Sequence, residues 1–357
     1  MSDSLKSVKI MEIRELFREN IRNLAPYSTA RDEYEGDLGI YLDANENPYE
    51  NGYNRYPDPH QKELKRRIAE IKGVDAGRIF IGNGSDEAID LVYRVFCEPR
   101  IHNVVSIAPS YGMYEVSAHT NDVEFRKIQL DADFRLDAQH VLDAVDENTR
   151  AVFLCSPNNP SGNLLDGGEV KKILDAFNGI VVIDEAYIDF AGMPGMLLLL
   201  HEYRRLVVLQ TFSKAWGMAG LRLGLAFADP QIIAVMSRVK YPYNINGITQ
   251  KIVLHQLADT GSVWNKVGEI RREREILIKE LENLPLIRKV FPSDANFVLV
   301  RVDDARGLYN ILIREGVIVR DRSRIPGCEG CLRITVGTPA ENRRLMEILR
   351  AFEPIQA

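Results

Sequence analysis

The pattern of hydrophobic and polar residues predicts how the chain is organised. Apolar residues at helical spacing between residues 10 and 24 predict an amphipathic helix, and a polar, loop-like stretch follows to about residue 40. From there to about residue 240, short apolar runs alternate with helical patterns. The runs predicted as strands are RIFIGN (78–83), NVVSIAP (103–109), RAVFLCS (150–156), GIVVIDEAY (179–187), RRLVVLQTF (204–212) and LRLGLAF (221–227).

Several of these strands are almost continuously apolar, as expected when helices cover both faces of a mostly parallel sheet. After about residue 245, a long helical stretch leads to three further strand patterns and two further helices, which predict a smaller α+β domain. The predicted fold class is therefore α/β. We expect an N-terminal helix and arm over residues 1–40, a large domain over 41–245 and a small domain over 246–357.

Composition and charge argue against several classes of protein. The 357 residues are 45% hydrophobic and 27% charged, with a net charge of −6, and no basic run indicates nucleic-acid binding. The opening MSDSLKSVKI contains no apolar signal-peptide stretch, and the run MPGMLLLL is too short to span a bilayer. We expect a cytoplasmic protein with no membrane or nucleic-acid partner.

The cysteine pattern raises the question of a metal site. Four cysteines are too few for a disulfide scaffold of this size, but Cys328 and Cys331 form a C-x-x-C pair. A zinc site needs a second pair of ligands at matching spacing, and the six histidines provide none. We expect no metal, and we expect the pair to lead into the strand CLRITVG as small, reduced residues.

Lys214 lies in an unusual setting for a lysine. It follows the predicted strand RRLVVLQTF within the segment SKAWGMAGLRLG, where small and apolar residues surround it. Lysines such as Lys171 lie instead in charged helical patterns that water can solvate. The glycines Gly217, Gly220 and Gly224 follow closely, which suggests a backbone shaped around something that approaches it.

Other strand ends also carry unusual groups. The segments GNGSDE, SPNNPSG and DEAY follow three of the predicted strands and contain Gly84, Ser85, Asp86, Asn159, Asp184 and Tyr187. Ser85 is placed to cap the next helix, which would leave free amides and a positive dipole end for an anion. Asp184, at the end of an apolar strand, needs a cation or a hydrogen-bond donor. Because ligands collect at the carboxyl ends of strands in open α/β sheets, these groups should share one crevice.

This set suits pyridoxal phosphate, which has a phosphate, a ring nitrogen, a phenolic oxygen and an aldehyde that condenses with lysine. The sequence resembles the fold-type-I pyridoxal-phosphate-dependent aminotransferases: SKAWGMAGLRLG is similar to their Schiff-base lysine signature, and NNPSG to their Asn-Pro-x-Gly loop. The closer resemblance, over almost the whole chain, is to the class II histidinol-phosphate aminotransferases. It rests on segments such as YLDANENP, APSYGMYEVSA, VIDEAYIDF and GCLRITVGT. Ser161 stands where threonine is commoner in that family.

The resemblance implies a role for each candidate residue. The implied catalytic residues are Lys214, Asp184 and Tyr187. The implied cofactor-binding residues are Gly84, Ser85, Asp86, Tyr111, Asn159, Asp184, Tyr187, Ser213, Lys214, Arg222 and, from the other subunit, Tyr56. Lys214 would carry the cofactor, with a pKa lowered by apolar surroundings and by Arg222. The resemblance also implies a homodimer with active sites at its interface, and a smaller domain completed by the N-terminal segment.

The implied reaction moves an amino group between histidinol phosphate and 2-oxoglutarate, giving imidazole-acetol phosphate and glutamate in histidine biosynthesis. One pocket must then accept the phosphate of one substrate and the carboxylate of the other. Arg333 in CLRITVG matches the arginine that receives the carboxylate in the family, and a planar guanidinium suits both anions. The implied substrate-binding residues are Arg320, Arg333, Tyr27, Tyr243 and Asn45.

Related functions share these motifs. An amino-acid-phosphate decarboxylase of the threonine-phosphate type has much the same pattern, and so does a related aromatic aminotransferase, so both stay open. A transcriptional regulator built on the same fold would carry a DNA-binding domain. Only about 40 residues precede the fold here, and they contain no basic helix-turn-helix pattern. The intact set of Lys214, Asp184 and Tyr187 favours an enzyme.

Overall fold

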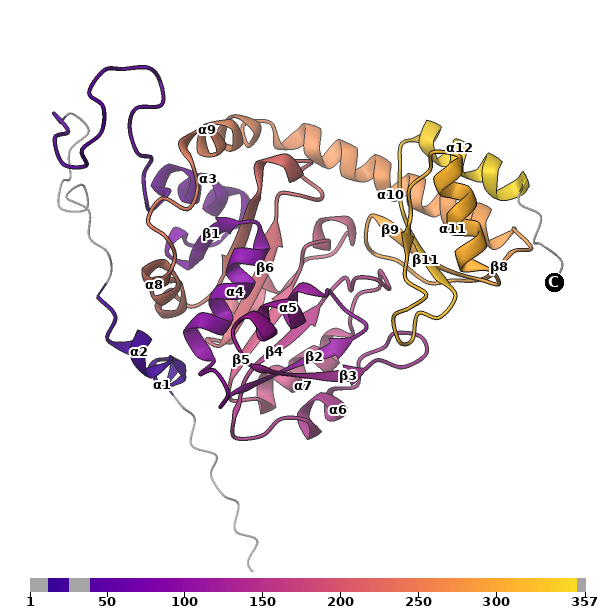
Figure 1. Cartoon of the computed structure of the whole chain (residues 1–357), viewed down its shortest axis with the longest axis horizontal. Helices are drawn as coiled ribbons and strands as arrows, with labels where there is room; N and C mark the ends of the chain where they lie inside the picture. Colours follow the sequence, from indigo (N-terminus) through magenta and orange to yellow (C-terminus); the bar gives the residue numbers. More distant parts are fainter. Residues whose placement is uncertain (1–11, 26–38, 352–357) are drawn as a thin grey trace, which may run out of the picture.

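A computed structural model describes residues 12–25 and 39–351 of the chain (Figure 1). Its larger sheet has seven strands in the order β1-β7-β6-β5-β4-β2-β3. The strands are β1 (Ile79–Asn83), β2 (Asn103–Ala108), β3 (Glu124–Gln129), β4 (Thr149–Cys155), β5 (Ile180–Asp184), β6 (Leu206–Thr211) and β7 (Leu223–Phe227). All neighbours from β6 to β3 are parallel, whereas β7 runs antiparallel to β1 and β6. The mostly parallel sheet predicted from the sequence is confirmed.

Helices cover both faces of this sheet, which explains its apolar strands. In β5, Val181 and Ile183 belong to one hydrophobic core, and Ile180 and Val182 belong to the other. Alternate residues of a strand point to opposite faces, so two covered faces require an unbroken apolar run. The surrounding helices are α3 (Lys62–Lys72), α4 (Ser85–Phe96), α5 (Met113–Thr120), α6 (Ala138–Asp143), α7 (Gly167–Ala176), α8 (Pro230–Val239) and α9 (Gly247–Gln256), with 3₁₀ turns η2 (Ala76–Arg78), η3 (Ile188–Phe190), η4 (Met196–His201) and η5 (Ala219–Leu221).

A smaller antiparallel sheet follows in the sequence and has the order β10-β11-β9-β8. It consists of β8 (Ile287–Val290), β9 (Phe297–Val302), β10 (Arg320–Asp321) and β11 (Cys331–Thr335), packed with α10 (Thr260–Glu282), α11 (Ala305–Arg314) and α12 (Pro339–Ala351). The long helix α10 runs from the large sheet toward this smaller layer (Figure 1). The α/β class with a smaller α+β part is thus confirmed, whereas the boundaries at residues 40 and 245 stay predictions.

Two strands were not predicted, and both lie at the edge of a sheet. Strand β3 has the sequence EFRKIQ, and β8 has the sequence IRKV. Each pairs with one neighbour only, and its side chains are exposed or half-buried. Charged residues are favourable at such edges because they discourage pairing with another chain. The apolar signal that indicates a buried strand is therefore missing.

The single N-terminal helix predicted over residues 10–24 is wrong. The structure has two four-residue helices, α1 (Ile13–Leu16) and α2 (Glu19–Arg22), and residues 10 and 11 lie outside the described residues. The backbone is extended at Phe17 and Arg18, where the Arg18 N–H donates to the Val95 carbonyl at 2.8 Å. This contact with the end of α4 replaces a hydrogen bond within the helix.

The described N-terminal residues also pack differently from our expectation. We expected the N-terminal segment to complete the smaller domain. Instead, Ile13, Leu16, Phe17 and Ile21 are buried in the core between the large sheet and helices α4 and α8. No helix in the described ranges is long and apolar enough to cross a membrane. The cellular location stays a prediction.

Candidate active site

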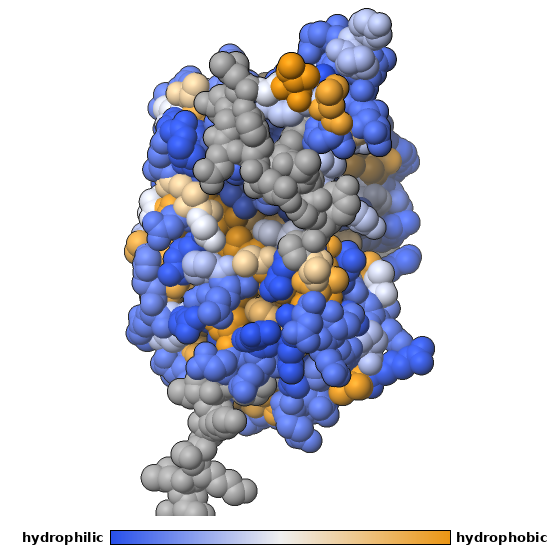
Figure 2. Space-filling view, turned by 90° about the vertical axis from the view of Figure 1, so that its left-hand side faces the viewer, coloured by the Kyte–Doolittle hydropathy of each residue, from blue (hydrophilic) through white to orange (hydrophobic). Residues whose placement is uncertain are grey.

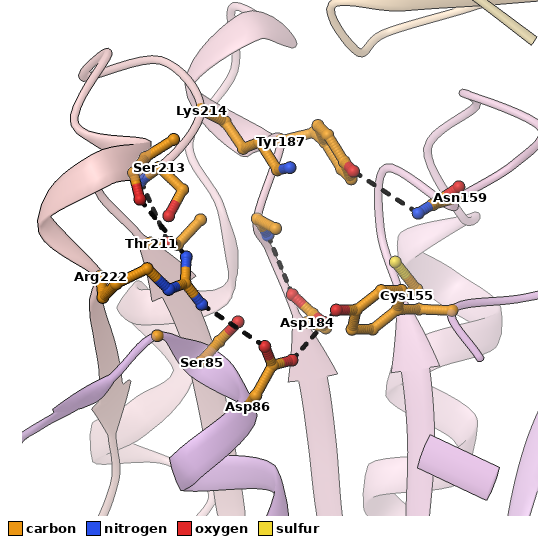
Figure 3. A pocket seen from close by; sticks show the side chains of 14 residues that line it. Ser85, Asp86, Cys155, Asn159, Asp184, Tyr187, Thr211, Ser213, Lys214 and Arg222 are labelled. Atoms are coloured by element: carbon orange, nitrogen blue, oxygen red, sulfur yellow. Dashed lines mark hydrogen bonds and ion pairs between the residues drawn. The ribbon is translucent and has the colours of Figure 1, made fainter. Parts of the chain in front are cut away.

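The carboxyl ends of β4, β5 and β6 and the start of α4 surround a pocket (Figure 3). It contains about 620 Å³ of empty space, including its open mouth, which is typical of a small-molecule site. Ten residues predicted as cofactor ligands line it: Gly84, Ser85, Asp86, Tyr111, Asn159, Asp184, Tyr187, Ser213, Lys214 and Arg222. The lining residues that we did not predict are Cys155, Ala186, Thr211 and Ala219.

Lys214 lies three residues beyond the end of β6, and its amine points into the pocket (Figure 3). Its Nζ is 5.6 Å from the centre of the Tyr187 ring. We expected a lysine enclosed by apolar residues, but the side chain is exposed where the pocket opens. Partial desolvation still lowers its pKa, and the positive charges of Arg333 and Arg222 lower it further, whereas Asp184 opposes this shift. Arg333 has a larger effect than Arg222, the residue that we had considered.

Asp184 is the last residue of β5, and its carboxylate is buried. The Tyr114 hydroxyl donates to its Oδ2 at 2.7 Å, and the Ala186 N–H donates to its Oδ1 at 3.1 Å. Burial raises the pKa of Asp184 to about 6 in spite of these donors. The hydrogen-bond donor that we expected beside the buried Asp184 carboxylate is therefore the Tyr114 hydroxyl. We did not predict it, because it lies 70 residues away in helix α5.

The start of α4 forms an anion-binding cradle at the same pocket. Ser85 is the first residue of the helix and Gly84 is its N-cap, with φ 73° and ψ 167°, so our prediction of Ser85 as the cap is wrong. No side chain caps this helix, which leaves its first amides and its positive dipole end for a ligand. A Cβ at Gly84 would lie 2.6 Å from Nη2 of Arg222. The positive φ favours glycine at this position, and the guanidinium would have to move to accommodate a Cβ.

Polar side chains surround this cradle. Arg222 Nη2 lies 3.7 Å from Oδ2 of Asp86, and the Tyr111 hydroxyl donates to Oδ1 of Asp86 at 3.0 Å. The Ser213 N–H donates to Oγ1 of Thr211 at 3.1 Å, and Figure 3 shows both residues beside Arg222. The cradle therefore combines helix amides, hydroxyl groups and one guanidinium, which is a donor set suited to phosphate.

Residues from both sheets meet on the opposite side of Lys214. Nδ2 of Asn159 donates to the Tyr187 hydroxyl at 3.5 Å, and Nη1 of Arg333 donates to Oδ1 of Asn159. The Arg333 guanidinium also lies 5.1 Å from the centre of the Phe297 ring. Because Arg333 belongs to β11, the smaller sheet supplies a cation to Asn159, a residue that lines the pocket built by the larger sheet.

Comparison with known proteins identifies the family. The family model described as aminotransferase class I and II matches residues 42–349. The chain belongs to the class I and II aminotransferases. Among its relatives, the histidinol-phosphate aminotransferase of Parabacteroides distasonis is 56% identical over 95% of this chain and 98% of its own length. That of Cytophaga hutchinsonii is 51% identical over 94% of this chain and 98% of its own length. The family predicted from the sequence is confirmed.

Solved structures show the same aminotransferase fold. The histidinol-phosphate aminotransferase of Clostridium acetobutylicum matches with a TM-score of 0.77 and 26% identity over 83% of this chain and 90% of its own. The enzyme of that name from Sinorhizobium meliloti, in complex with pyridoxal-5'-phosphate, matches with a TM-score of 0.75 and 24% identity over 83% of each chain. L-threonine-O-3-phosphate decarboxylase from Porphyromonas gingivalis matches with a TM-score of 0.72 and 25% identity over 84% of this chain and 90% of its own length. The fold thus occurs in both kinds of enzyme.

Five described residues that we predicted as ligands do not line the pocket that contains Lys214: Asn45, Tyr56, Tyr243, Arg320 and Arg333. Asn45, Tyr56 and Tyr243 line a separate, open hollow with about 2070 Å³ of empty space, and the rings of Tyr56 and Tyr243 stack 4.4 Å apart. Tyr27 lies outside the described residues. A single chain therefore does not bring these residues to the pocket, and their binding roles stay predictions.

The two cysteines of the C-x-x-C pair lie in the core of the protein. Cys328 and Cys331 are free thiols, and both are buried against Phe134, Phe291 and Leu299. Within residues 12–25 and 39–351, no group of three or more histidine, cysteine, aspartate or glutamate side chains is placed to hold a metal. Both thiols are therefore small core residues, and Cys331 is the first residue of β11.

Proposed function

We propose that this aminotransferase moves the amino group between histidinol phosphate and 2-oxoglutarate, using pyridoxal phosphate, as a step of histidine biosynthesis. The observation that carries the proposal is that Lys214, Asp184 and the uncapped start of α4 line one pocket. The names of the relatives that are 45–56% identical favour this substrate over a decarboxylase substrate. The two decarboxylases among the solved structures match at 24% and 25% identity.

The donor groups of the pocket fit pyridoxal phosphate. The first amides of α4 would bind the phosphate together with Ser213 and Arg222, because no side chain among the described residues caps that helix. Asp184 would bind the ring nitrogen. Its buried carboxylate has a raised pKa, and a protonated nitrogen beside it would compensate for the lost solvation. Asn159 and Tyr187 would bind the phenolic oxygen, and Tyr111 would cover the ring face.

The chain's own residues would then have separate tasks. The bound cofactor supplies an electron sink, which allows a proton to leave the amino-bearing carbon of the substrate. Lys214 Nζ would attach the cofactor, and after its release it would move that proton. Its lowered pKa favours the neutral amine that both tasks need. Arg333 would bind the anionic group of the substrate and so orient the reacting carbon toward Lys214.

A homodimer with active sites at its interface is part of the proposal. The hollow containing Tyr56 and Tyr243 is lined by residues within 44–57 and 243–252, among them the exposed apolar side chains of Tyr53, Ile248 and Ile252. Figure 2 shows apolar surface on this side of the molecule. Exposed apolar area of this kind is typical of a protein–protein interface. In such a dimer, Tyr56 would reach the cofactor phosphate of the partner.

A product assay tests the reaction. The purified enzyme is supplied with histidinol phosphate and 2-oxoglutarate, and glutamate is measured with a coupled dehydrogenase while carbon dioxide is collected from parallel samples with threonine phosphate. We expect glutamate in proportion to imidazole-acetol phosphate and no carbon dioxide above background. Release of carbon dioxide without formation of glutamate would show that the enzyme is a decarboxylase instead.

A further inference from the structure

Lys240 is a buried lysine that does not line the Lys214 pocket. It is the C-cap residue of helix α8, and 9% of it is exposed. Its ammonium group donates three hydrogen bonds, to the carbonyls of Pro59 at 2.9 Å, Tyr241 at 3.1 Å and Pro242 at 2.8 Å. An ammonium group has three N–H donors, so all of them are used. The side chain therefore ties together two segments that lie about 180 residues apart in the sequence.

The backbone around Lys240 has few donors of its own. Residues 56–59 and 241–246 form neither helix nor strand, so no regular ladder of hydrogen bonds binds their carbonyls. Pro57, Pro59 and Pro242 have no N–H group. Among the side chains of proteins, lysine alone carries three donors on one atom. Lys240 thus supplies donors that the backbone lacks at the point where three carbonyls converge.

The charge of Lys240 is retained at neutral pH. Burial lowers its pKa to about 8, the Glu87 carboxylate opposes this shift, and Lys65 and Asp58 have smaller effects of opposite sign. The ammonium form therefore predominates near pH 7. A buried charge is unfavourable unless hydrogen-bond acceptors surround it. The ammonium group and the three carbonyls consequently stabilise one another.

The tied segments carry two tyrosines of the open hollow. Pro59 lies three residues after Tyr56, and Pro242 directly precedes Tyr243. The rings of these tyrosines stack with their centres 4.4 Å apart and their planes 12° apart. Half of the Tyr56 surface is exposed, whereas Lys240 is buried. The lysine therefore fixes the backbone of both segments while the Tyr56 ring stays accessible at the surface.

We propose that Lys240 is a positioning residue that holds Tyr56 where it reaches the cofactor phosphate of the partner subunit. This inference rests on the proposed function, in which Tyr56 completes the site of the other chain. A tyrosine hydroxyl must lie within about 3 Å of a phosphate oxygen to donate to it, so a small shift of the Tyr56 backbone removes the hydrogen bond. Lys240 acts within its own chain, but the site that depends on it belongs to the partner.

Cofactor binding measures this effect without turnover. Equilibrium dialysis compares pyridoxal phosphate with pyridoxal, which lacks the phosphate, for the wild type, Lys240→Met and Tyr56→Phe. We expect both variants to bind pyridoxal phosphate about tenfold more weakly and pyridoxal within about twofold of the wild type, because each loses a hydrogen bond to a charged group. Lys62→Met is the matched control: it removes the same charge from an exposed position and should change neither affinity. Equal weakening of both ligands by Lys240→Met, or no weakening, would overturn the proposal.

Subunit mixing identifies the site that depends on Lys240. In a hybrid of Lys240→Met with Lys214→Ala, one site takes Lys214 from the first chain and a correctly held Tyr56 from the second. Its activity should exceed that of either variant. Mixing Lys240→Met with Tyr56→Phe should give no such gain, because neither site then receives a correctly held Tyr56. The reverse pattern would show that Lys240 serves the pocket of its own chain and would overturn the proposal.

Two further outcomes keep the inference separate from the proposed function. If Lys240→Met does not fold, Lys240→Gln replaces it, because an amide keeps two donors on one nitrogen, and the same pattern with a smaller loss is expected. If Lys214→Ala and Tyr56→Phe do not rescue each other after proven subunit exchange, the interface site is wrong and the role of Lys240 with it. A wild type that binds pyridoxal phosphate but does not convert histidinol phosphate would overturn the proposed reaction alone, since the dialysis comparison needs no substrate.

Discussion

Replacing Tyr114 by phenylalanine removes the hydroxyl that donates to the buried carboxylate of Asp184 at 2.7 Å. Both side chains are buried, so water does not take the place of the lost donor. The remaining donor to this carboxylate is the Ala186 N–H at 3.1 Å. The phenol of Tyr114 has a pKa raised well above its ordinary value by burial, so it donates at every pH of interest. The substitution therefore tests how Tyr114 controls the ionisation of Asp184.

The expected magnitude follows from the two protonation states of Asp184. A hydrogen bond to a charged group contributes about 1.5–3 kcal/mol, and one to a neutral group about 0.5–1.5 kcal/mol. Losing the donor should therefore cost the ionised form about 1–2 kcal/mol more than the protonated form, which raises the pKa of Asp184 by roughly one unit. Burial already raises this pKa from the ordinary 3.8 to about 6. A shift to roughly 7 is thus expected in the variant.

The sign of the pH dependence follows from this raised pKa. The folded chain binds the Asp184 proton more tightly than the unfolded chain, so the contribution of this group to stability is fully present below pH 3.8 and is lost as pH rises through about 6. In Tyr114→Phe, the loss should continue to roughly pH 7. The substitution should therefore destabilise the protein by about 0.5–1.5 kcal/mol near pH 5 and by about 1.5–3 kcal/mol near pH 8.

Urea unfolding of ligand-free protein near pH 5 and near pH 8 measures both values. Tyr93→Phe is the matched control, because its buried hydroxyl donates to the uncharged Tyr114 carbonyl at 2.8 Å. That variant should lose about 0.5–1.5 kcal/mol at both pH values. If the loss for Tyr114→Phe is also independent of pH, the argument that its hydroxyl stabilises an ionised Asp184 is refuted.

Two further predictions concern the cofactor and the dimer. Gly84→Ala places a Cβ 2.6 Å from Arg222 Nη2 at φ 73°, so we expect cofactor affinity measured by equilibrium dialysis to fall at least about tenfold. Gly77→Ala, where the added Cβ meets nothing within 4 Å, should not lower it. Mixing Lys214→Ala subunits with Tyr56→Phe subunits should restore activity above that of either variant, because one site of each hybrid has both residues. Absence of rescue after proven subunit exchange would place Tyr56 in the site of its own chain.

The sequence by itself determined six of the seven strands of the larger sheet and ten of the fourteen residues that line the Lys214 pocket. An apolar run bounded by polar residues indicates a buried strand. The residues that follow the run lie at the carboxyl end of that strand, whatever the rest of the chain does. Lys214, Asp184 and Asn159 could be selected for this reason, since Asp184 ends β5 and the other two lie three and four residues beyond the ends of β6 and β4. The same logic fails for β3, because its side chains are exposed or half-buried and its sequence EFRKIQ is therefore not an apolar run.

Only the tertiary structure decided which distant groups meet. The donor to Asp184 lies 70 residues away, and Arg333 reaches Asn159 across 174 residues. No local pattern distinguishes Tyr114 from other tyrosines. The break between α1 and α2 likewise depends on a hydrogen bond from Arg18 to Val95. Local sequence sets which backbone conformations are favourable, but contacts between distant segments contribute enough free energy to override that preference and to set the partners of buried polar groups.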